Sequence, residues 1–390
     1  PLTAGLVSEL EGAPPEVVIY LTQNSVKHHK DEVPESLAAL KTADKGGMGA
    51  KSLLPISDPY SDGTETYKNA FSQGTEDMKW WQEDDSMGTG QVKIGEDVLT
   101  LGAQNQKPTD GDVAKIREDW RTLLIHVGLS KERSASVLEA MLTDSDGKAQ
   151  LTASGAGASN ELAQLIAVFD RAERGEFIIS TIVLSGHHYS GDNHIFGEDD
   201  SHGYDDDILT GDTLNMKDIE SLKGVFPKAF KQVKAVMFSA CNTHDIGMSD
   251  DGGDLLSTNE WLESTFPSVE KSSYWEDTAP GSDMAAFFSG EFLLDLARES
   301  SGKDPKAFED AYFRSTQSGD NIRSKRSEDG KLTEQSTKKN TDSYEYNDYK
   351  GLRDSNHEPF HEREDLMEYV AGEDGKSLSD GKLSEEERRD

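Results

Sequence analysis

Cysteine is nearly absent from this chain. Only Cys241 occurs among the 390 residues, so the sequence excludes an internal disulfide and any zinc or iron–sulfur site built from several cysteines. A protein without disulfides fits a reducing compartment, and we therefore expect a cytoplasmic location.

Long apolar runs are missing as well. No stretch reaches the length of a membrane-spanning helix, and no signal peptide is visible. The sequence begins at Pro1 rather than at Met, so a removed leader stays an open alternative. Apolar residues make up 34% of the chain and the mean hydropathy is -0.69. Both values are low for one compact fold, and we expect a large fraction of loop or tail.

Positive charge is scarce relative to negative charge. Asp and Glu total 75 against 40 Lys and Arg, which gives a formal net charge of -35. A surface of this sign repels nucleic acid and anionic membranes, so neither is an expected partner. The acidity fits solubility in salt, divalent-ion binding and attraction to basic partners, and composition does not separate these three.

The chain divides into three regions. Residues 1–105 contain Val17–Leu21, the expected first strand of a sheet, followed by a long polar insertion; alternatively these residues form a module of their own. Residues 106–315 carry most of the apolar periodicity and are expected to form the main α/β domain. Residues 316–390 are polar and acidic, which favours an extension outside that domain.

The main region alternates helices with strands. Apolar spacing predicts helices over 113–127, 131–142, 160–174 and 283–299. The third of these begins at a capping residue, Asn160, and leads directly into an apolar strand over 177–184. A helix that feeds an apolar strand is typical of a parallel α/β sheet.

Two apolar runs end in chemically active side chains. Phe177–Leu184 leads into His187 and His188, and Ala235–Phe238 leads into Cys241. The stretch between the histidines and the cysteine has room for one helical crossover, so the two strands are expected to be parallel neighbours. Open α/β sheets build their sites at the carboxyl ends of such strands. A thiol beside an imidazole is the minimum requirement for a cysteine nucleophile.

The motifs at these strand ends resemble those of a known family. Leu184-Ser185-Gly186-His187, followed by Phe-Ser-Ala-Cys-Asn-Thr at 238–243, is similar to the caspase-like (clan CD) cysteine peptidases, most closely to their bacterial CHAT branch. Residues 214–219 resemble the short helix before the cysteine strand of those domains, and 274–279 resemble their Trp-x-x-Asp strand end. The likeness covers 175–300 and implies a caspase-like fold, a mainly parallel sheet flanked by helices.

The resemblance also implies an activity, that of a cysteine endopeptidase with a His/Cys dyad. In that family pattern Cys241 attacks the peptide carbonyl, His187 protonates the leaving amine, and the backbone amides of His188 and Cys241 hold the oxyanion. Asp277 or Glu276 lines the pocket for the residue before the scissile bond, where a carboxylate favours Lys or Arg. The implied partners are protein or peptide substrates and a regulatory protein, with self-processing in the polar stretches.

One position departs from the family pattern. The family has glycine after the catalytic histidine, whereas this chain has His188. A backbone amide remains, but the added ring is expected to constrain the loop or narrow the mouth of the site. The two adjacent histidines leave open which of them is the base, and the pattern favours His187. A catalytically inactive interaction or scaffold module remains the alternative, with Cys241 as a small buried hydrophobe.

Two metal hypotheses stand beside the peptidase. Thiolate and imidazole are zinc ligands, and several histidines lie near Cys241 in the sequence: His187, His188, His194, His202 and His244. Their spacing matches no zinc signature. The acidic loop at 198–207 offers carboxylates to Ca2+, but it does not complete the EF-hand spacing. We therefore expect no cofactor, with Ca2+ as the alternative.

Overall fold

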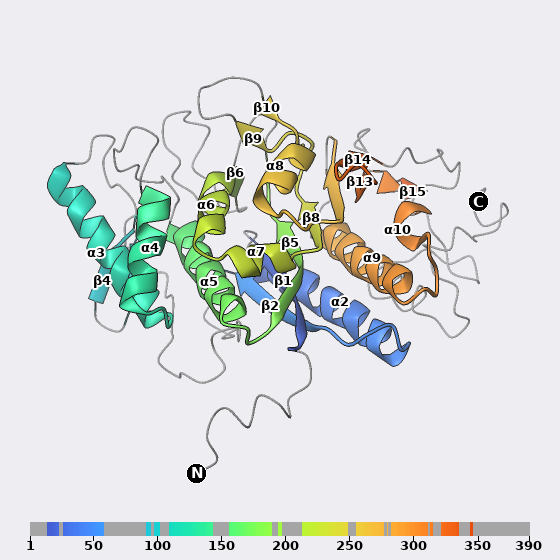
Figure 1. The fold of residues 1–390 in the computed structure, drawn as a ribbon, viewed down its shortest axis with the longest axis horizontal. Helices are drawn as coiled ribbons and strands as arrows, with labels where there is room; N and C mark the ends of the chain where they lie inside the picture. Colours follow the sequence, from blue (N-terminus) through green and yellow to red (C-terminus); the bar gives the residue numbers. More distant parts are fainter. Residues whose placement is uncertain are drawn as a thin grey trace, which may run out of the picture.

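The computed structural model describes a central body of the chain and shorter stretches on either side of it (Figure 1). The described residues are 14–22, 26–57, 91–94, 97–101, 109–142, 156–188, 194–196, 213–248, 255–276, 279, 282–310, 313–314, 321–334 and 344–345. Among these residues, no helix combines the length and the apolar character needed to cross a bilayer.

A seven-stranded sheet forms the centre of the fold, in the order β14-β13-β11-β8-β5-β1-β2. Its strands are β1 (Glu16–Thr22), β2 (Ser52–Ser57), β5 (Ile178–Ser185), β8 (Ala235–Ser239), β11 (Lys271–Trp275), β13 (Asn321–Arg326) and β14 (Leu332–Glu334). The five strands from β2 to β11 are parallel, and β13 and β14 are antiparallel to their neighbours. The predicted α/β fold, with a mostly parallel sheet, is therefore confirmed.

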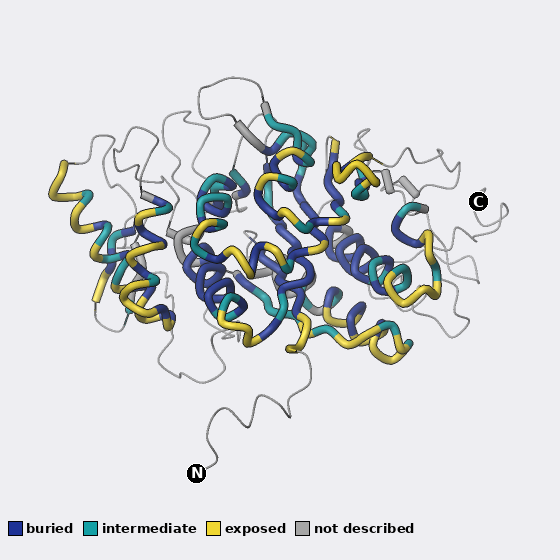
Figure 2. Tube along the Cα trace, in the orientation of Figure 1, coloured by how far each residue is buried: buried dark blue, intermediate teal, exposed yellow. Residues whose placement is uncertain are grey.

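Helices cover both faces of this sheet (Figures 1 and 2). The first face packs against α5 (Ala156–Glu173), α6 (Met216–Ser221), α7 (Pro227–Gln232) and α8 (Thr258–Thr265), and the second against α2 (Val26–Lys45) and α9 (Ser282–Ser300). Along β1, Val17, Ile19 and Leu21 lie in the first core, whereas Val18 and Tyr20 lie in the second. Because successive side chains of a strand point to opposite faces, a strand buried on both sides must be apolar throughout.

Smaller elements surround this three-layer core. They are α3 (Asp110–His126), α4 (Lys131–Leu142), a 3-10 turn (Leu222–Gly224), α10 (Ala307–Asp310), and the strand pairs β3 (Gln91–Ile94) with β4 (Asp97–Thr100), β6 (His194–Phe196) with β7 (Thr213–Asn215), β9 (Gly247–Met248) with β10 (Leu255–Leu256), and β12 (Phe313–Arg314) with β15 (Tyr344–Glu345).

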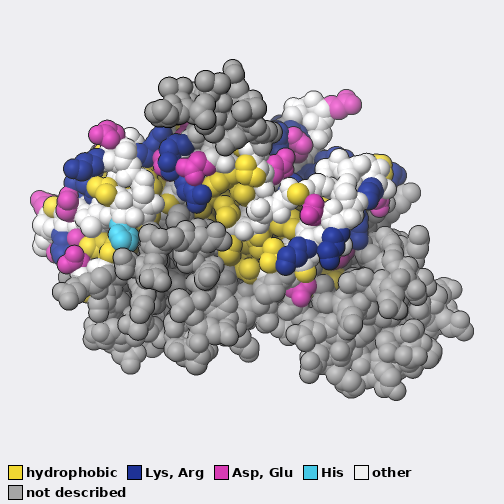
Figure 3. Space-filling model, turned by 90° about the horizontal axis from the view of Figure 1, so that it is seen from below, with side chains coloured by type: hydrophobic (Ala, Val, Ile, Leu, Met, Phe, Trp, Pro, Cys, Tyr) yellow, Lys and Arg dark blue, Asp and Glu magenta, His cyan; other side chains and the backbone are white. Residues whose placement is uncertain are grey.

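Seen from below, Lys and Arg side chains gather beside apolar ones on the described surface (Figure 3). On this one face of the described residues, positive charge is therefore concentrated locally in spite of the acidic total.

Two predicted boundaries are wrong by a few residues. The helix expected to begin at Asn160 begins at Ala156, because the small residues before Asn160 include two alanines, which favour helix. Leu214 lies in β7 and pairs with Ile195 of β6, so the following helix begins at Met216. The cap of that helix is Asn215, whose side chain accepts a hydrogen bond from the Lys217 amide at 2.8 Å.

The described N-terminal residues belong to the main sheet. Val17–Leu21 is confirmed as a strand, and β1 pairs in parallel with β5 on one side and β2 on the other. Residues 14–22 and 52–57 are therefore part of the same sheet as the strands that precede His187 and Cys241, rather than a separate module.

The expectation that a polar extension begins at 316 is wrong for residues 321–334. These residues form β13 and β14, which complete the sheet beyond β11. Their polar side chains are buried because they have partners: Asn321 hydrogen-bonds Ser273 at 3.0 Å, and Ser324 lies 3.1 Å from the Tyr274 hydroxyl. Polar side chains are tolerated in a core when they are paired in this way, and apolar periodicity therefore does not detect the strand.

Arg323 of β13 forms a buried ion pair. Its guanidinium lies 2.9 Å from the Asp295 carboxylate of α9, and both side chains are 1% exposed. Arg298 contacts the other carboxylate oxygen at 3.1 Å. Burial raises the pKa of Asp295, and the two guanidinium groups counter that effect. The pair attaches β13 to the helix that covers the second face.

We expect Arg323→Met to lower the free energy of unfolding by about 3–5 kcal/mol, because it leaves the Asp295 carboxylate buried without its nearest cation. Chemical denaturation near neutral pH measures this loss. Lys234→Met is the matched control, because Lys234 pairs with Glu270 at 2.8 Å where both side chains are about half exposed; its cost should stay below about 1 kcal/mol. Equal costs for the two variants would contradict the structural role of Arg323.

Candidate active site

Neighbouring parallel strands carry the two residues of the predicted dyad. Strands β5 and β8 pair in register from Thr181 with Ala235 to Ser185 with Ser239. His187 and Cys241 each follow two positions after this last pair. The Gly186 amide donates to the Ser239 carbonyl at 3.3 Å, so the ladder extends past the last paired residues toward the site. The expectation that the two strands are parallel neighbours is confirmed.

Side-chain alternation relates the two strand ends to the faces of the sheet. Leu184 and Phe238, which are paired, lie in the first core, and the preceding pair, Val183 and Met237, lies in the core under α2 and α9. Alternation continued past the strand ends, across the bends at Gly186 and Ala240, predicts that His187 and Cys241 face α2 and α9 and that His188 faces the opposite side. Cys241 does pack against the α2–α9 core.

The Cys241 thiol is half-buried and has a polar neighbour. Its sulfur accepts a hydrogen bond from the Ala279 amide at 3.3 Å, a residue that follows β11. Trp275, at the end of β11, lies in the same core. A donor directed at sulfur stabilises a thiolate more than a neutral thiol, because the charged form is the stronger acceptor. His187 is likewise half-buried.

The ring of His188 lies inside the protein. It is 1% exposed, and its Nδ1 lies 3.0 Å from the backbone carbonyl of Cys241. A carbonyl oxygen can only accept, so Nδ1 carries the proton in this hydrogen bond. The sequence leaves open whether this ring constrains the loop or narrows the mouth of the site. The structure favours the constraint on the loop, because the buried ring contacts the backbone carbonyl of Cys241 itself.

The turn after Cys241 is held by hydrogen bonds from several elements. Asn242 has a φ of 52°, a left-handed conformation that asparagine tolerates better than most residues. The buried Thr243 hydroxyl donates to the Ala240 carbonyl at 3.1 Å and accepts from the Trp275 amide at 3.1 Å. One threonine therefore joins the cysteine turn to the end of β11.

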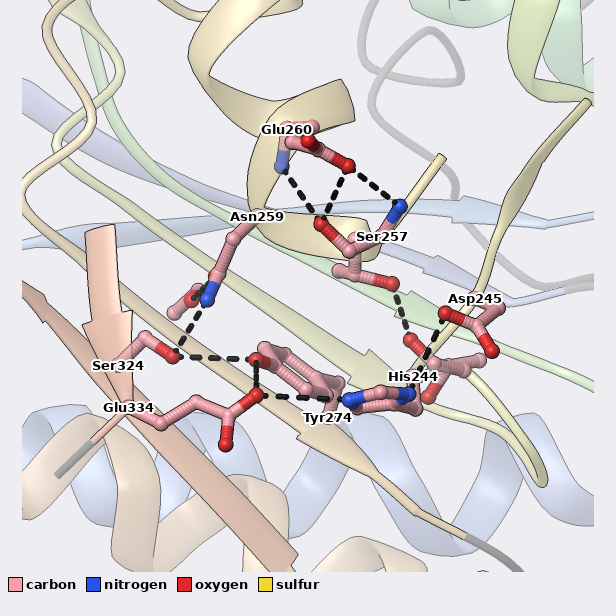
Figure 4. A network of polar contacts seen from close by, with 11 residues as sticks. His244, Asp245, Ser257, Asn259, Glu260, Tyr274, Ser324 and Glu334 are labelled. Carbon is pink, nitrogen blue, oxygen red and sulfur yellow. Dashed lines mark hydrogen bonds and ion pairs between the residues drawn. The ribbon is translucent and has the colours of Figure 1, made fainter. Parts of the chain in front are cut away.

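A polar network continues from this turn to β14 (Figure 4). His244 lies between two carboxylates, Asp245 at 3.3 Å and Glu334 at 3.4 Å. The Tyr274 hydroxyl donates to Glu334 at 3.3 Å and lies 3.1 Å from Ser324. Burial raises the pKa of Tyr274, so this side chain stays a neutral phenol. Sequence reasoning missed the network because Glu334 belongs to the stretch that was expected to be an extension.

The remaining predicted site residues are partly described. Glu276 is exposed and directly follows β11, whereas Asp277 lies outside the described residues. His194 belongs to β6 and contacts the side-chain amide of Asn215 at 3.1 Å.

Only part of the two metal hypotheses falls on residues that the structure describes. His202 and the acidic loop at 198–207 lie outside the described residues. Within the part of the chain that the structure does describe, no group of three or more His, Cys, Asp or Glu side chains is arranged to hold a metal ion.

Comparisons of the chain with family models, with curated proteins and with solved structures find no match. The geometry at the ends of β5 and β8 is therefore the basis for inferring a function.

Removal of the Thr243 hydroxyl tests how firmly the cysteine turn is held. We expect Thr243→Val to lower the free energy of unfolding by about 1–3 kcal/mol, because it deprives the buried Trp275 amide of its acceptor while the shape is kept. Thr42→Val is the control: the Thr42 hydroxyl donates to Ala38 at 2.9 Å on the exposed side of α2, and its cost should be within about 0.5 kcal/mol. If Thr243→Val lowers the free energy of unfolding no more than Thr42→Val does, the Thr243 hydroxyl does not connect the cysteine turn to β11.

Proposed function

We propose that this chain is a cysteine endopeptidase that hydrolyses peptide bonds of protein substrates through Cys241 and His187. The observation that carries the proposal is the register of β5 and β8, because both residues follow two positions after the same strand pair. Alternation continued past the strand ends predicts that both side chains face α2 and α9, and Cys241 does pack against that core. The caspase-like motifs of the sequence support the same assignment.

In the proposed reaction the Cys241 thiol gives its proton to His187, and the resulting thiolate attacks the carbonyl carbon of the scissile bond. A C–S bond forms as the carbonyl π electrons move to oxygen, and backbone amides of His188 and Cys241 hold this oxyanion. Collapse of the tetrahedral intermediate breaks the C–N bond while His187 gives its proton to the leaving amine. Water then gives a proton to His187 as its oxygen attacks the thioester. The C–S bond breaks, the Cys241 sulfur takes that proton back from His187, and the carboxylic acid product leaves and loses its own proton to solvent.

The substrate side of the proposal rests on charge. Glu276 is exposed directly after β11, the strand next to β8, and a carboxylate there favours Lys or Arg before the scissile bond. A net charge of -35 also attracts basic segments of a protein toward the enzyme. We propose cleavage of one or a few proteins at exposed loops, self-processing in the polar stretches, and control by a regulatory protein.

Alkylation by iodoacetamide tests the dyad without a known substrate, since Cys241 is the only thiol. We expect the unaltered chain to react at neutral pH about tenfold faster than its His187→Ala variant, because the imidazole assists formation of the thiolate. His126→Ala, at the exposed end of α3, is the matched control and should react like the unaltered chain. Slow labelling that is equal in all three proteins would contradict the proposal and favour the scaffold alternative.

Cleavage of a peptide library tests the reaction itself. We expect products cut after Lys or Arg, no products from Cys241→Ala, and a weaker basic preference in Glu276→Gln. Products that persist in Cys241→Ala would assign the hydrolysis to another group or to a contaminant and would contradict the proposal.

A further inference from the structure

We propose that His188 is a positioning residue: its imidazole holds the peptide group of Cys241 and so sets the direction of the thiol relative to His187. This inference rests on the proposed function and concerns the same site. It assigns a role to the ring that stands where the caspase-like pattern has glycine, a residue with no side chain to make such a contact.

The first support is the position of the contact in the ladder between β5 and β8. In a parallel pair the hydrogen bonds of one strand recur every second residue. The Gly186 amide donates to Ser239, so the next acceptor in the series is the carbonyl of Cys241. The His188 ring donates to that carbonyl at 3.0 Å. A side chain thus adds one further connection between the strands, at the residue that carries the thiol.

The second support is the burial of the ring. At 1% exposure an imidazole needs hydrogen-bond partners, and the loss of one costs more than the bond contributes. Nδ1 carries a proton both in the neutral tautomer required here and in the imidazolium, so the contact persists whichever form is present. The hydrogen bond from His188 to the Cys241 carbonyl therefore does not depend on the protonation changes that the proposed reaction requires of His187.

The third support is the geometry that the contact fixes. Because the Cys241 carbonyl is directed toward β5, the plane of the next peptide is set, and Asn242 follows with a φ of 52°. Thr243 then connects the turn to Trp275. The backbone on the carboxyl side of the thiol is therefore fixed by β5 through His188 and by β11 through Thr243, while Ala279 contacts the sulfur.

Three substitutions of His188 distinguish a role of the hydrogen bond from Nδ1 from a role in which the side chain only fills space. In Asn the side-chain nitrogen lies near the place of Nδ1, in Gln it lies near the place of Nε2, and Leu has no donor. The readout is the His187-dependent part of iodoacetamide alkylation, measured as the ratio of rate constants with and without His187→Ala in each background. We expect the Leu and Gln variants to reduce this ratio about tenfold toward one, and Asn to keep it within about threefold.

A second readout follows the turn itself. Amide hydrogen exchange over 240–244 should accelerate in the Leu and Gln variants and stay slow in Asn, whatever the activity. Gln and Asn keep the polarity of the site, so the comparison stands even if the Leu variant fails to fold. Unaltered ratios and unaltered exchange in all three variants would overturn the proposal. A ratio lost in the Asn variant with unchanged exchange would also overturn it, because His188 would then act on the thiol by something other than the position of the backbone.

Failure of the proposed function gives a different pattern. If the unaltered chain and His187→Ala already react alike, the dyad is absent and a catalytic positioning role for His188 falls with it. If the unaltered chain shows the His187-dependent rate and the His188 variants share it, only the present inference falls.

Discussion

The parallel register between β5 and β8 is the constraint on which the rest of the site depends. It places His187 and Cys241 each two residues after the last strand pair, Ser185 with Ser239. A shift of one residue would send one of the two side chains to the other face of the sheet, because the period of a strand is two. The register is itself fixed by apolar side chains on both faces, which must enter two different cores.

The surroundings of Cys241 are built from strands that are distant in the sequence. The amide of Ala279 after β11 contacts the sulfur, the ring of His188 after β5 contacts the carbonyl, and His244 connects the turn to Glu334 of β14. These contacts hold the backbone at Cys241 in one direction, which is the preorganisation that the proposed reaction needs. The antiparallel strands at the edge of the sheet thereby support the site as well as extending the fold.

Apolar runs predict the parts of this structure that depend on burial alone. Strands β1, β5 and β8 follow from runs of apolar residues, and with them the placement of His187 and Cys241 after neighbouring strand ends. Strand β13 is not predictable in this way. Arg323 is buried because it pairs with Asp295, and Asn321 is buried because it pairs with Ser273; both partners belong to other elements of the chain. The sequence leaves open whether the His188 ring constrains the loop or narrows the mouth of the site, because its partner is a backbone carbonyl that follows another strand.

Disulfide trapping tests the central claim most directly, because Cys241 has no competing thiol. Neighbouring strands lie about 4.8 Å apart, within the range of Cα separations of roughly 4.4–6.8 Å that a disulfide spans. Under mild oxidation His187→Cys should lose both free thiols to an intramolecular bond, whereas His188→Cys, directed to the opposite face, should retain them. Cross-linking of the His188→Cys variant but not of the His187→Cys variant would show that His187 and Cys241 do not face each other.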